Sequence, residues 1–332
     1  MLFTVFLLLF PPTGIAGDIA PQSDRIKTIR SLKKLDDFPL YVMHFYGDYE
    51  LPNYAPRASL SQDIQSGCRS GNLYLWACTC FSAKTEQGSQ LLGRNFDWSS
   101  HPALLLFTNP PGRYASVSMV DISYLGYSKS DAPDKNPGGL LRSPLLPFDG
   151  MNEQGLAVGM MAVPSAHGPD DPQKQTAGSL LIIRLILDYA KNVDQAIAIL
   201  KKFNISFQEG PPLHYFITDR SGKSVVAEFV NRKISVLSNT HPWQVATNFI
   251  ITGLSPESAR ASCWRYKKVW ETLESQVMFT LLNALSLLED VSQGNTIWSV
   301  VYDTSSLNFL VVMGRKYGQV HEFNLKQGAA GQ

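Results

Sequence analysis

The sequence predicts an α+β fold in which helices pack outside antiparallel sheets. Short strand-like segments come in groups joined by tight turns, which is typical of antiparallel meanders. Helical segments separate one group from the next, instead of alternating with single strands as in a parallel βαβ sheet. The chain has 332 residues, of which 44% are hydrophobic. That is enough for a sizeable core in one large domain or two small ones, and we find no internal repeat and no obvious linker.

The N-terminus begins with an almost entirely apolar run, residues 1–10, which Pro11, Pro12 and small residues then interrupt. The run is too short to span a bilayer and predicts a signal peptide over residues 1–17, and hence an exported protein. A buried N-terminal strand is the alternative, because the basic segment that usually precedes such a run is missing. No later stretch is long and apolar enough to predict an integral membrane segment.

The elements of the first half follow from local spacing and turn residues. Residues 18–40 have polar and apolar positions at helical spacing, and residues 41–49 are aromatic-rich and strand-like. Two strands, 73–83 and 90–95, predict a β-hairpin around the Gly88 turn. Further strands are predicted at 104–108, 114–120 and 155–163, a turn at 67–71, and loops at 128–139 and 164–177.

The second half alternates helices with groups of strands. Helices are predicted at 179–190 and 193–203, with Asn192 as the N-cap of the second. A largely helical stretch is predicted at 256–288. Strands are predicted at 214–219, 224–229, 233–237, 296–302, 308–313 and 319–323.

Charge and composition exclude several classes of partner. The net charge is +1, from 29 basic and 28 acidic residues, without long runs of like charge. Nucleic acid and polybasic membrane binding are therefore not expected, and the expected partner is a small or roughly neutral molecule. The chain has no C-x-x-C or H-E-x-x-H motif and its six histidines are scattered, so no metal site is predicted. In an exported protein, one or two disulfides could form among Cys68, Cys78, Cys80 and Cys263.

One group of residues could carry nucleophilic chemistry. Cys78 opens one strand of the predicted hairpin, while Arg94 and Asp97 end the other, so a tight hairpin can bring the three side chains together. A cysteine beside an arginine is expected to have a lowered pKa and more thiolate. Asp97 could hold a nearby amine or orient the arginine. The alternative is an inert core cysteine beside a salt-bridged turn, and composition alone favours it.

The segment Cys78-Thr79, followed by Gly93-Arg94-Asn95-Phe96-Asp97, resembles the signature of the choloylglycine hydrolase family. That family includes bile salt hydrolases and penicillin V acylases. The segment is also similar to acid ceramidases, N-acylethanolamine acid amidases and the acyltransferases of penicillin biosynthesis. Similar segments follow in order at 149–156, 213–222, 247–248 and 262–268, so the resemblance runs from about residue 41 to about residue 323.

The resemblance implies the four-layer αββα sandwich of N-terminal-nucleophile hydrolases and hydrolysis of a linear amide. Autocatalytic cleavage between Ala77 and Cys78 would make residues 18–77 a pro-segment or small subunit and residues 78–332 the catalytic domain. An α-amine titrates near ~7.7–8.0 and can serve as a base, whereas a peptide nitrogen cannot. The implied substrate is a small N-acyl amide, without a cofactor, and a homo-oligomer is compatible with the sequence.

Further roles are carried over from the family. Arg94 and Asp97 would hold the amine and the thiolate in register, and Arg265 would complete the polar network behind the nucleophile. Asn248 would donate its side-chain N–H to the oxyanion, beside the backbone N–H of Ala162. The family often has Asn or Tyr where Ala162 stands, which makes bile salts and penicillin V doubtful substrates.

Four apolar side chains flank the implied site and either line an acyl pocket or pack in the core: Phe96, Trp98, Met160 and Met161. The loops at 109–150 and 164–177 are candidate lids.

Alternatives remain at residue and molecular level. Cys80 and Thr79 are rival nucleophiles, but neither keeps the spacing to the arginine and the aspartate. Asn152 is expected to form a turn, and His214 and His241 to be structural. An N-acyltransferase, a non-catalytic acyl-amide-binding protein and a disulfide-linked secreted protein are the alternative functions.

Overall fold

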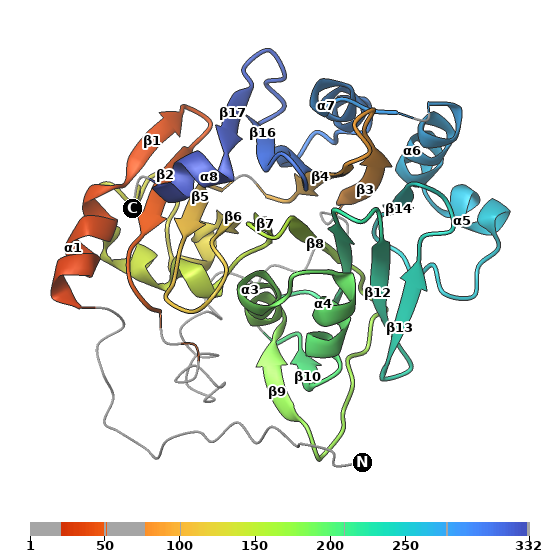
Figure 1. Ribbon diagram of the computed structural model, residues 1–332, viewed down its shortest axis with the longest axis horizontal. Coiled ribbons are helices and arrows are strands. Elements are labelled where there is room, and N and C mark those ends of the chain that lie inside the picture. The colour runs from red at the N-terminus through yellow and green to blue at the C-terminus, as the bar shows by residue number, and fades with distance from the viewer. Residues whose placement is uncertain are drawn as a thin grey trace, which may run out of the picture.

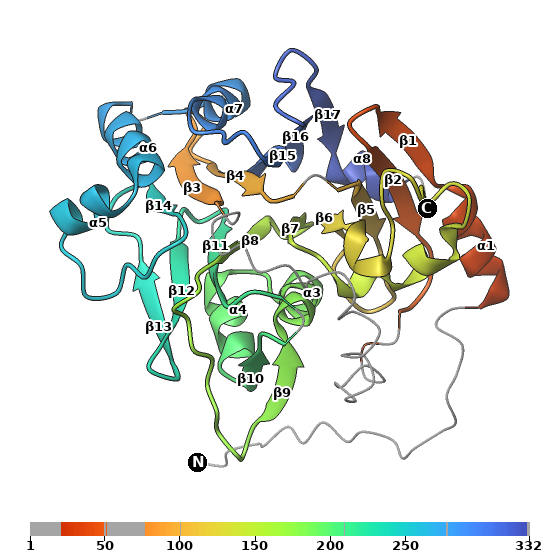
Figure 2. The same cartoon turned by 180° about the vertical axis from the view of Figure 1, so that it is seen from behind.

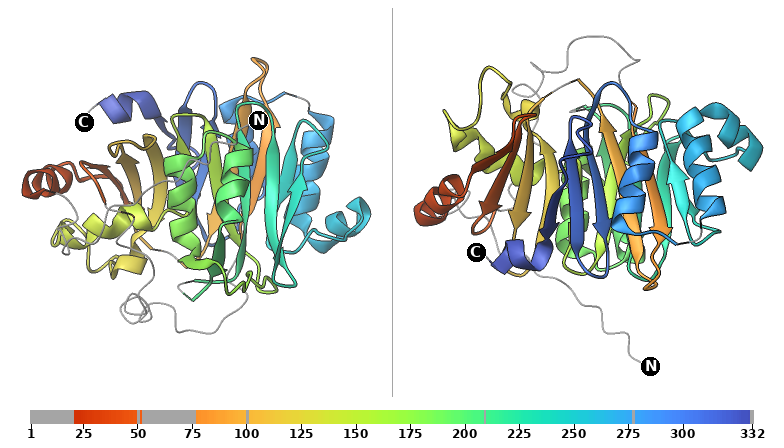
Figure 3. Two further views of the ribbon diagram at one scale, coloured as in Figure 1. Left: turned by 60° about the horizontal axis from the view of Figure 1, so that its bottom comes forward. Right: turned by 90° about the horizontal axis from the view of Figure 1, so that it is seen from above.

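Two β-sheets face each other in the middle of the molecule, and helices cover the outer side of each (Figures 1 and 3). The computed structural model describes residues 21–49, 51, 77–99, 101–208, 210–276 and 278–330. The predicted α+β fold, with helices outside two sheets, is confirmed. The predicted signal peptide, the turn at 67–71, Cys68 and residues 18–20, 50 and 52–76 of the predicted pro-segment lie outside the described residues.

The larger sheet has nine strands and is antiparallel except where β2 lies parallel to β5. Its N-terminal strands therefore join the sheet beside a strand that follows much later in the chain. From edge to edge its strands are β1 (Lys33–Asp36), β2 (Leu40–Phe45), β5 (Ala103–Thr108), β6 (Ser116–Asp121), β7 (Asp149–Asn152), β8 (Leu156–Ala162), β11 (Leu213–Asp219), β12 (Ser224–Val230) and β13 (Lys233–Ser238).

The smaller sheet has six strands, all paired antiparallel, and contains the predicted hairpin at its centre. Its order is β14 (Gln244–Ala246), β3 (Thr79–Lys84), β4 (Gln90–Asp97), β15 (Thr296–Asp303), β16 (Asn308–Met313) and β17 (His321–Asn324). A separate two-stranded parallel sheet pairs β9 (Gln175–Gly178) with β10 (Phe203–Ser206).

Helices cover each sheet with their apolar faces. Against the nine-stranded sheet pack α3 (Ser179–Tyr189) and α4 (Val193–Leu200), and the Asn192 side chain caps α4 by accepting from the Gln195 N–H at 3.0 Å, as predicted. Beside β3, β4 and β14 lie α5 (Pro256–Ser262), α6 (Trp264–Ser275) and α7 (Leu281–Asp290) (Figure 2). The remaining helices are α1 (Gln22–Arg30), α8 (Leu325–Ala330) and the 3₁₀ segments η2 (Ile122–Leu125) and η3 (Pro137–Leu145).

Two predictions of helices were wrong in part. The helix predicted over 18–40 is α1 followed by β1, and the end of the helix predicted over 193–203 is β10. In both segments, pairing with another strand, β1 with β2 and β10 with β9, overrides the local helical spacing. The turn expected at Asn152 is confirmed, since its Oδ1 accepts from the Gln154 and Leu156 N–H groups while its Nδ2 donates to the Leu187 and Ala190 carbonyls.

Strand β8 of the larger sheet lies against β3 and β4 of the smaller sheet. A Cβ placed on Gly159 of β8 would lie 3.0 Å from Arg94 Cδ and 3.3 Å from Cys80 Sγ. The absence of a side chain at this position therefore allows Arg94 to lie between the layers.

Candidate functional site

The predicted hairpin brings its functional residues to one place in the centre of the sandwich. Cys80 pairs directly with Arg94 across β3 and β4, and Thr79 pairs with Asn95. Gly88 has a φ of +80° in the turn that joins the strands. Cys78 precedes β3 by one residue and therefore lies beside the end of β4, where Asp97 stands.

Cys78 is held through its backbone and its sulfur. Its N–H donates to Asn248 Oδ1 at 2.6 Å, and the backbone N–H of Asp97 donates to its sulfur. The guanidinium of Arg265, from the first turn of α6, donates to the Cys78 carbonyl oxygen and, at 2.8 Å, to Thr79 Oγ1. Side chains distant in sequence thus converge on the two backbone polar groups of Cys78.

The expected lowering of the Cys78 pKa was wrong. The side chain is 1% exposed, and burial raises the pKa of the Cys78 thiol. The positive charges of Arg94 and Arg265 oppose this effect without overcoming it. The reason is that removing a thiolate from water outweighs its attraction to nearby guanidinium groups. In the uncut chain the thiol therefore stays protonated at neutral pH.

Asp97 is buried and carries one carboxyl oxygen without a partner. Oδ1 accepts from Thr296 Oγ1 at 2.5 Å, whereas Oδ2 has no hydrogen-bond partner among the described residues. Burial raises the pKa of Asp97 to about 7, although Thr296 and the charge of Arg265 act in the opposite direction. Buried carboxyl oxygens are rarely left unpaired, so Oδ2 is suited to receive a donor absent from the uncut chain.

Arg94 has a buried counter-ion, Asp149, which the sequence did not single out as functional. The two form an ion pair with both side chains fully buried. Asp149 also accepts from Tyr302 OH at 2.7 Å and Trp298 Nε1 at 3.0 Å. A buried guanidinium requires an acidic partner. The only indication of that partner in the sequence was the aspartate at the start of the segment 149–156.

The geometry of Asn248 differs from the role that the resemblance implied. Its Nδ2 donates to the carbonyl oxygen of Ala162 at 2.8 Å. Its Oδ1 faces the Cys78 nitrogen and also accepts from Arg265 Nη2 at 3.1 Å. In this arrangement Asn248 orients the backbone nitrogen of Cys78. An oxyanion could accept a hydrogen bond from Asn248 Nδ2 only by displacing the Ala162 carbonyl oxygen.

The four residues expected near an acyl pocket are tightly packed. Phe96 stacks on Trp298 with ring centroids 4.0 Å apart and lies beneath the Arg94 guanidinium at 5.1 Å. Trp98 stacks on Phe96 at 6.1 Å and is half-buried, whereas Met160 and Met161 are buried. These contacts favour packing for Phe96, and the pocket role of the group stays a prediction.

The rival nucleophiles have other partners. The Cys80 thiol is fully buried, with its sulfur against Arg94, and burial raises its pKa. The hydroxyl of Thr79 accepts from Arg265. Cys78, Cys80 and Cys263 all carry free thiols. Among the cysteines that the structure describes, only Cys78 contacts both Asn248 and Asp97.

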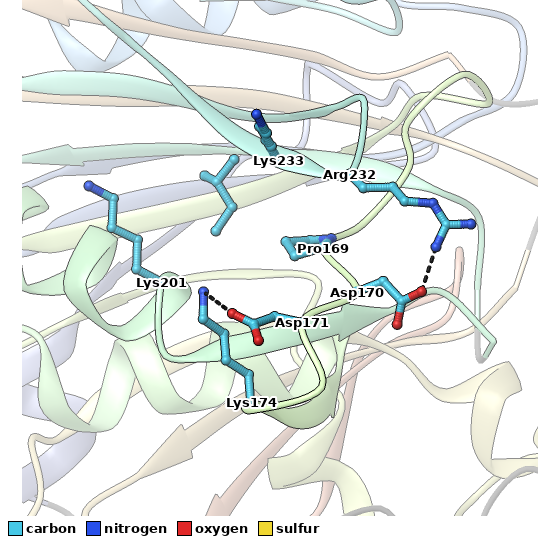
Figure 4. A pocket seen from close by; sticks show the side chains of 8 residues that line it. Pro169, Asp170, Asp171, Lys174, Lys201, Arg232 and Lys233 are labelled. Atoms are coloured by element: carbon cyan, nitrogen blue, oxygen red, sulfur yellow. Dashed lines mark hydrogen bonds and ion pairs between the residues drawn. The ribbon is translucent and has the colours of Figure 1, made fainter.

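A cavity lies apart from Cys78, between the loop before β9, the end of α4 and the start of β13 (Figure 4). Its volume is about 340 Å³. Arg232 pairs with Asp170 at 2.5 Å, and Lys174 with Asp171 at 3.7 Å. The residues that line it include no Cys, Ser or Thr, so it offers no thiol or hydroxyl nucleophile for acyl transfer.

Within the described ranges, no helix is long and apolar enough to cross a bilayer. The same residues include no group of three or more His, Cys, Asp or Glu side chains that could hold a metal ion.

Comparisons with known proteins identify the family and the fold. The sequence profile described as linear amide C–N hydrolases, choloylglycine hydrolase family, matches residues 78–264. The uncharacterised protein A284L of Paramecium bursaria Chlorella virus 1 is 34% identical over 110 residues, which span 30% of this chain and 39% of the viral protein.

Two solved structures are similar in fold. Penicillin V acylase from Agrobacterium tumefaciens has a TM-score of 0.56 and 18% identity, with 75% of this chain and 87% of that chain covered. A variant of the conjugated bile acid hydrolase from Clostridium perfringens has a TM-score of 0.55 and 17% identity, with 75% and 93% covered.

Proposed function

Because the chain belongs to the choloylglycine hydrolase family of linear amide C–N hydrolases, we propose that it hydrolyses a small N-acyl amide with Cys78 as the nucleophile. One observation carries this assignment. Asn248, Asp97 and Arg265 converge on Cys78, and Asn248 Oδ1 accepts from the nitrogen that cleavage of the preceding bond would turn into an α-amine. The family profile also begins to match at Cys78.

Self-cleavage is the first step of the proposal. The Cys78 sulfur adds to the carbonyl carbon of Ala77, the C–N bond breaks, and the nitrogen takes up the thiol proton. The products are a thioester and a free α-amine on Cys78. Water then hydrolyses the thioester, which leaves a carboxylate on Ala77 and restores the thiol.

Cleavage supplies the base that the uncut site lacks. The raised pKa of the Cys78 thiol means that the sulfur needs a proton acceptor. The new α-amine would have a pKa near ~7.7–8.0. Asn248 Oδ1 already lies 2.6 Å from this nitrogen, and Asp97 Oδ2 is available to bind the ammonium form.

Turnover then follows with the same groups. The α-amine takes the Cys78 proton, and the sulfur attacks the amide carbonyl of the substrate. The α-ammonium protonates the departing amine as the acyl-thioester forms. Water, activated by the α-amine, releases the carboxylic acid and restores the thiol. The oxyanion donors expected from the family are Asn248 Nδ2 and the Ala162 N–H. Asn248 Nδ2 now donates to the Ala162 carbonyl oxygen, so the substrate oxygen would have to replace that carbonyl as the acceptor.

Two parts of the proposal concern the acceptor and the location of the enzyme. If an amine replaced water as the acyl acceptor, the protein would be an N-acyltransferase, as the similarity to the acyltransferases of penicillin biosynthesis implies. Export, inferred from residues 1–17, also stays a prediction.

The test is intact-mass analysis under reducing, denaturing conditions, followed by assay with a panel of N-acyl amides. We expect a large fragment that begins at Cys78, absent from the Cys78→Ala variant together with hydrolysis. Cys263→Ala is the matched control, because it removes a free, partly exposed thiol at the N-cap of α6 and leaves Cys78 and Arg265 in place, so it should retain self-cleavage and hydrolysis. Hydrolysis by an unbroken chain, or by Cys78→Ala, would refute the mechanism. Acyl product on an added amine would identify the transferase.

A further inference from the structure

The loop that carries Asn248 begins at one sheet and is held by the other. β14 (Gln244–Ala246) pairs with β3 of the six-stranded sheet, and the chain then passes through Asn248 to residues 251–252. Two buried side chains of the nine-stranded sheet, His214 on β11 and Glu228 on β12, contact this loop on either side of Asn248.

His214 fixes the residue immediately before Asn248. Its Nε2 lies 2.7 Å from the carbonyl oxygen of Thr247. Because a carbonyl oxygen can only accept, the ring nitrogen is the donor. The other ring nitrogen, Nδ1, lies 3.4 Å from Glu228 Oε1 without a hydrogen bond between them, so the imidazole and the carboxylate are neighbours that each hold the loop separately.

Glu228 fixes the far side of the loop. Its Oε1 accepts from the Ile251 N–H at 2.7 Å, and its Oε2 accepts from the Thr252 N–H at 2.8 Å. Burial acts to raise the pKa of Glu228, but the neighbouring His214 side chain and the hydrogen bonds from the loop hold it below its ordinary value. The carboxylate, which can only accept, therefore satisfies two adjacent backbone donors.

We propose that His214 and Glu228 form a positioning pair that sets the Asn248 amide against the backbone nitrogen of Cys78. The inference rests on the proposed function, in which that nitrogen becomes the catalytic base. The pair holds the loop backbone on both sides of Asn248, whose Oδ1 then lies 2.6 Å from the Cys78 nitrogen. A displacement of about 1 Å at such a site can lower a rate by about 10²-fold.

Kinetics of the self-cleaved enzyme test the role of His214. His214→Leu removes the donor to Thr247, whereas His214→Gln keeps an N–H donor at similar reach. We expect kcat to fall roughly 10–100-fold in the leucine variant with little change in KM, because the pair acts through an oriented group. The glutamine variant should recover most of this loss.

Tyr215→Phe is the matched control for these variants. Tyr215 is the next residue of β11 and points to the other face of the sheet. Its hydroxyl donates to the Ser179 carbonyl at 2.8 Å, also in the buried interior. Its loss should leave kcat unchanged. An undiminished kcat in His214→Leu, or an equal loss in Tyr215→Phe, would overturn the proposal.

Hydrogen exchange tests the same pair without reference to activity. In Glu228→Gln, one of the two loop N–H groups would face an amide NH₂ instead of an acceptor. We expect the amides of Ile251 and Thr252 to exchange at least about 10-fold faster, with unchanged protection in the sheet cores. Unchanged exchange of these two amides would overturn the proposal that Glu228 holds the loop. A wild-type chain that neither cleaves itself nor hydrolyses any N-acyl amide would refute the proposed function, and the exchange result would then decide alone whether the pair holds the loop.

Discussion

At the scale of single residues, Asp97 and Cys78 show how burial sets the chemistry of the site. Both are almost fully buried, and in both burial raises the pKa of the side chain above its ordinary value. The uncut chain therefore favours a neutral thiol and a carboxyl group that titrates near neutrality. A new α-ammonium beside Asp97 Oδ2 would favour the carboxylate, so cleavage and ionisation of the site are coupled.

This coupling predicts a pH-dependent stability of the uncut protein. The pKa of Asp97 is about 7 in the folded chain, against 3.8 ordinarily. The folded state therefore holds this proton more tightly, and the stability that the proton provides is complete below pH 3.8 and declines as the pH rises to about 7. The slope should approach about 1.4 kcal/mol per pH unit in that interval.

The measurement compares Cys78→Ala with Cys78→Ala/Asp97→Asn, since neither can cleave itself by the proposed route. Denaturant unfolding at pH 5 and pH 7 should show a smaller loss of stability for the double variant. Equal losses in the two proteins would show that Asp97 is already ionised in the folded, uncut chain.

At the scale of elements, the N-terminal segment is built into the nine-stranded sheet, which faces the sheet of the Cys78 hairpin. β2 lies between β1 and β5 and pairs with β5 along its whole length. Beyond it, the buried Tyr49 donates to Asp188 Oδ1 at 2.7 Å, and its ring lies 4.3 Å from the Arg113 guanidinium. Figure 1 shows α1, β1 and β2 at the edge of the molecule opposite α5. These contacts favour a small subunit that is retained over a pro-segment that leaves.

We therefore expect residues 21–49 to stay bound after cleavage before Cys78. Removing β2 would expose an apolar strand and the edge of β5, which is unfavourable. Size-exclusion chromatography under native conditions should give one peak that contains both fragments, with two bands after denaturation. Tyr49→Phe, which keeps the ring and loses the bond to Asp188, should release the segment at a lower denaturant concentration. Elution of the larger fragment alone from native wild-type protein would contradict this expectation.

At the scale of the whole molecule, the site depends on how closely the two sheets approach. Gly159 of β8 faces Arg94 and Cys80 across the interface. Arg94 cannot easily move aside, because Asp149 and the carbonyl oxygens of Phe148 and Met160 hold its guanidinium. The added methyl group in Gly159→Ala must therefore separate the layers or distort Arg94.

We expect Gly159→Ala to lower the free energy of unfolding by about 1–3 kcal/mol, as overpacking does elsewhere, and to lower hydrolysis as well. Gly294→Ala is the matched control, since nothing lies within 4 Å of a Cβ placed there. It should change stability by less than about 0.5 kcal/mol. Chemical denaturation of both variants provides the comparison. Equal stability of the two would mean that the interface between the sheets accommodates the methyl group without a loss of free energy of unfolding.

The sequence by itself determined the features that depend on neighbouring residues. Two short strand-like segments and the Gly88 turn predicted the hairpin of β3 and β4, and Asn192 predicted the start of α4. The family followed from ordered local motifs. These predictions held because turn geometry and capping act over a few residues.

Only the tertiary structure decided which distant groups meet and how deeply they are buried. It paired β2 with β5, made Asp149 the counter-ion of Arg94, and turned the Asn248 oxygen toward Cys78. It also reversed the expected shift of the Cys78 pKa. The physical reason is that desolvation and long-range hydrogen bonds depend on the packing of two sheets, which no local pattern in the chain contains.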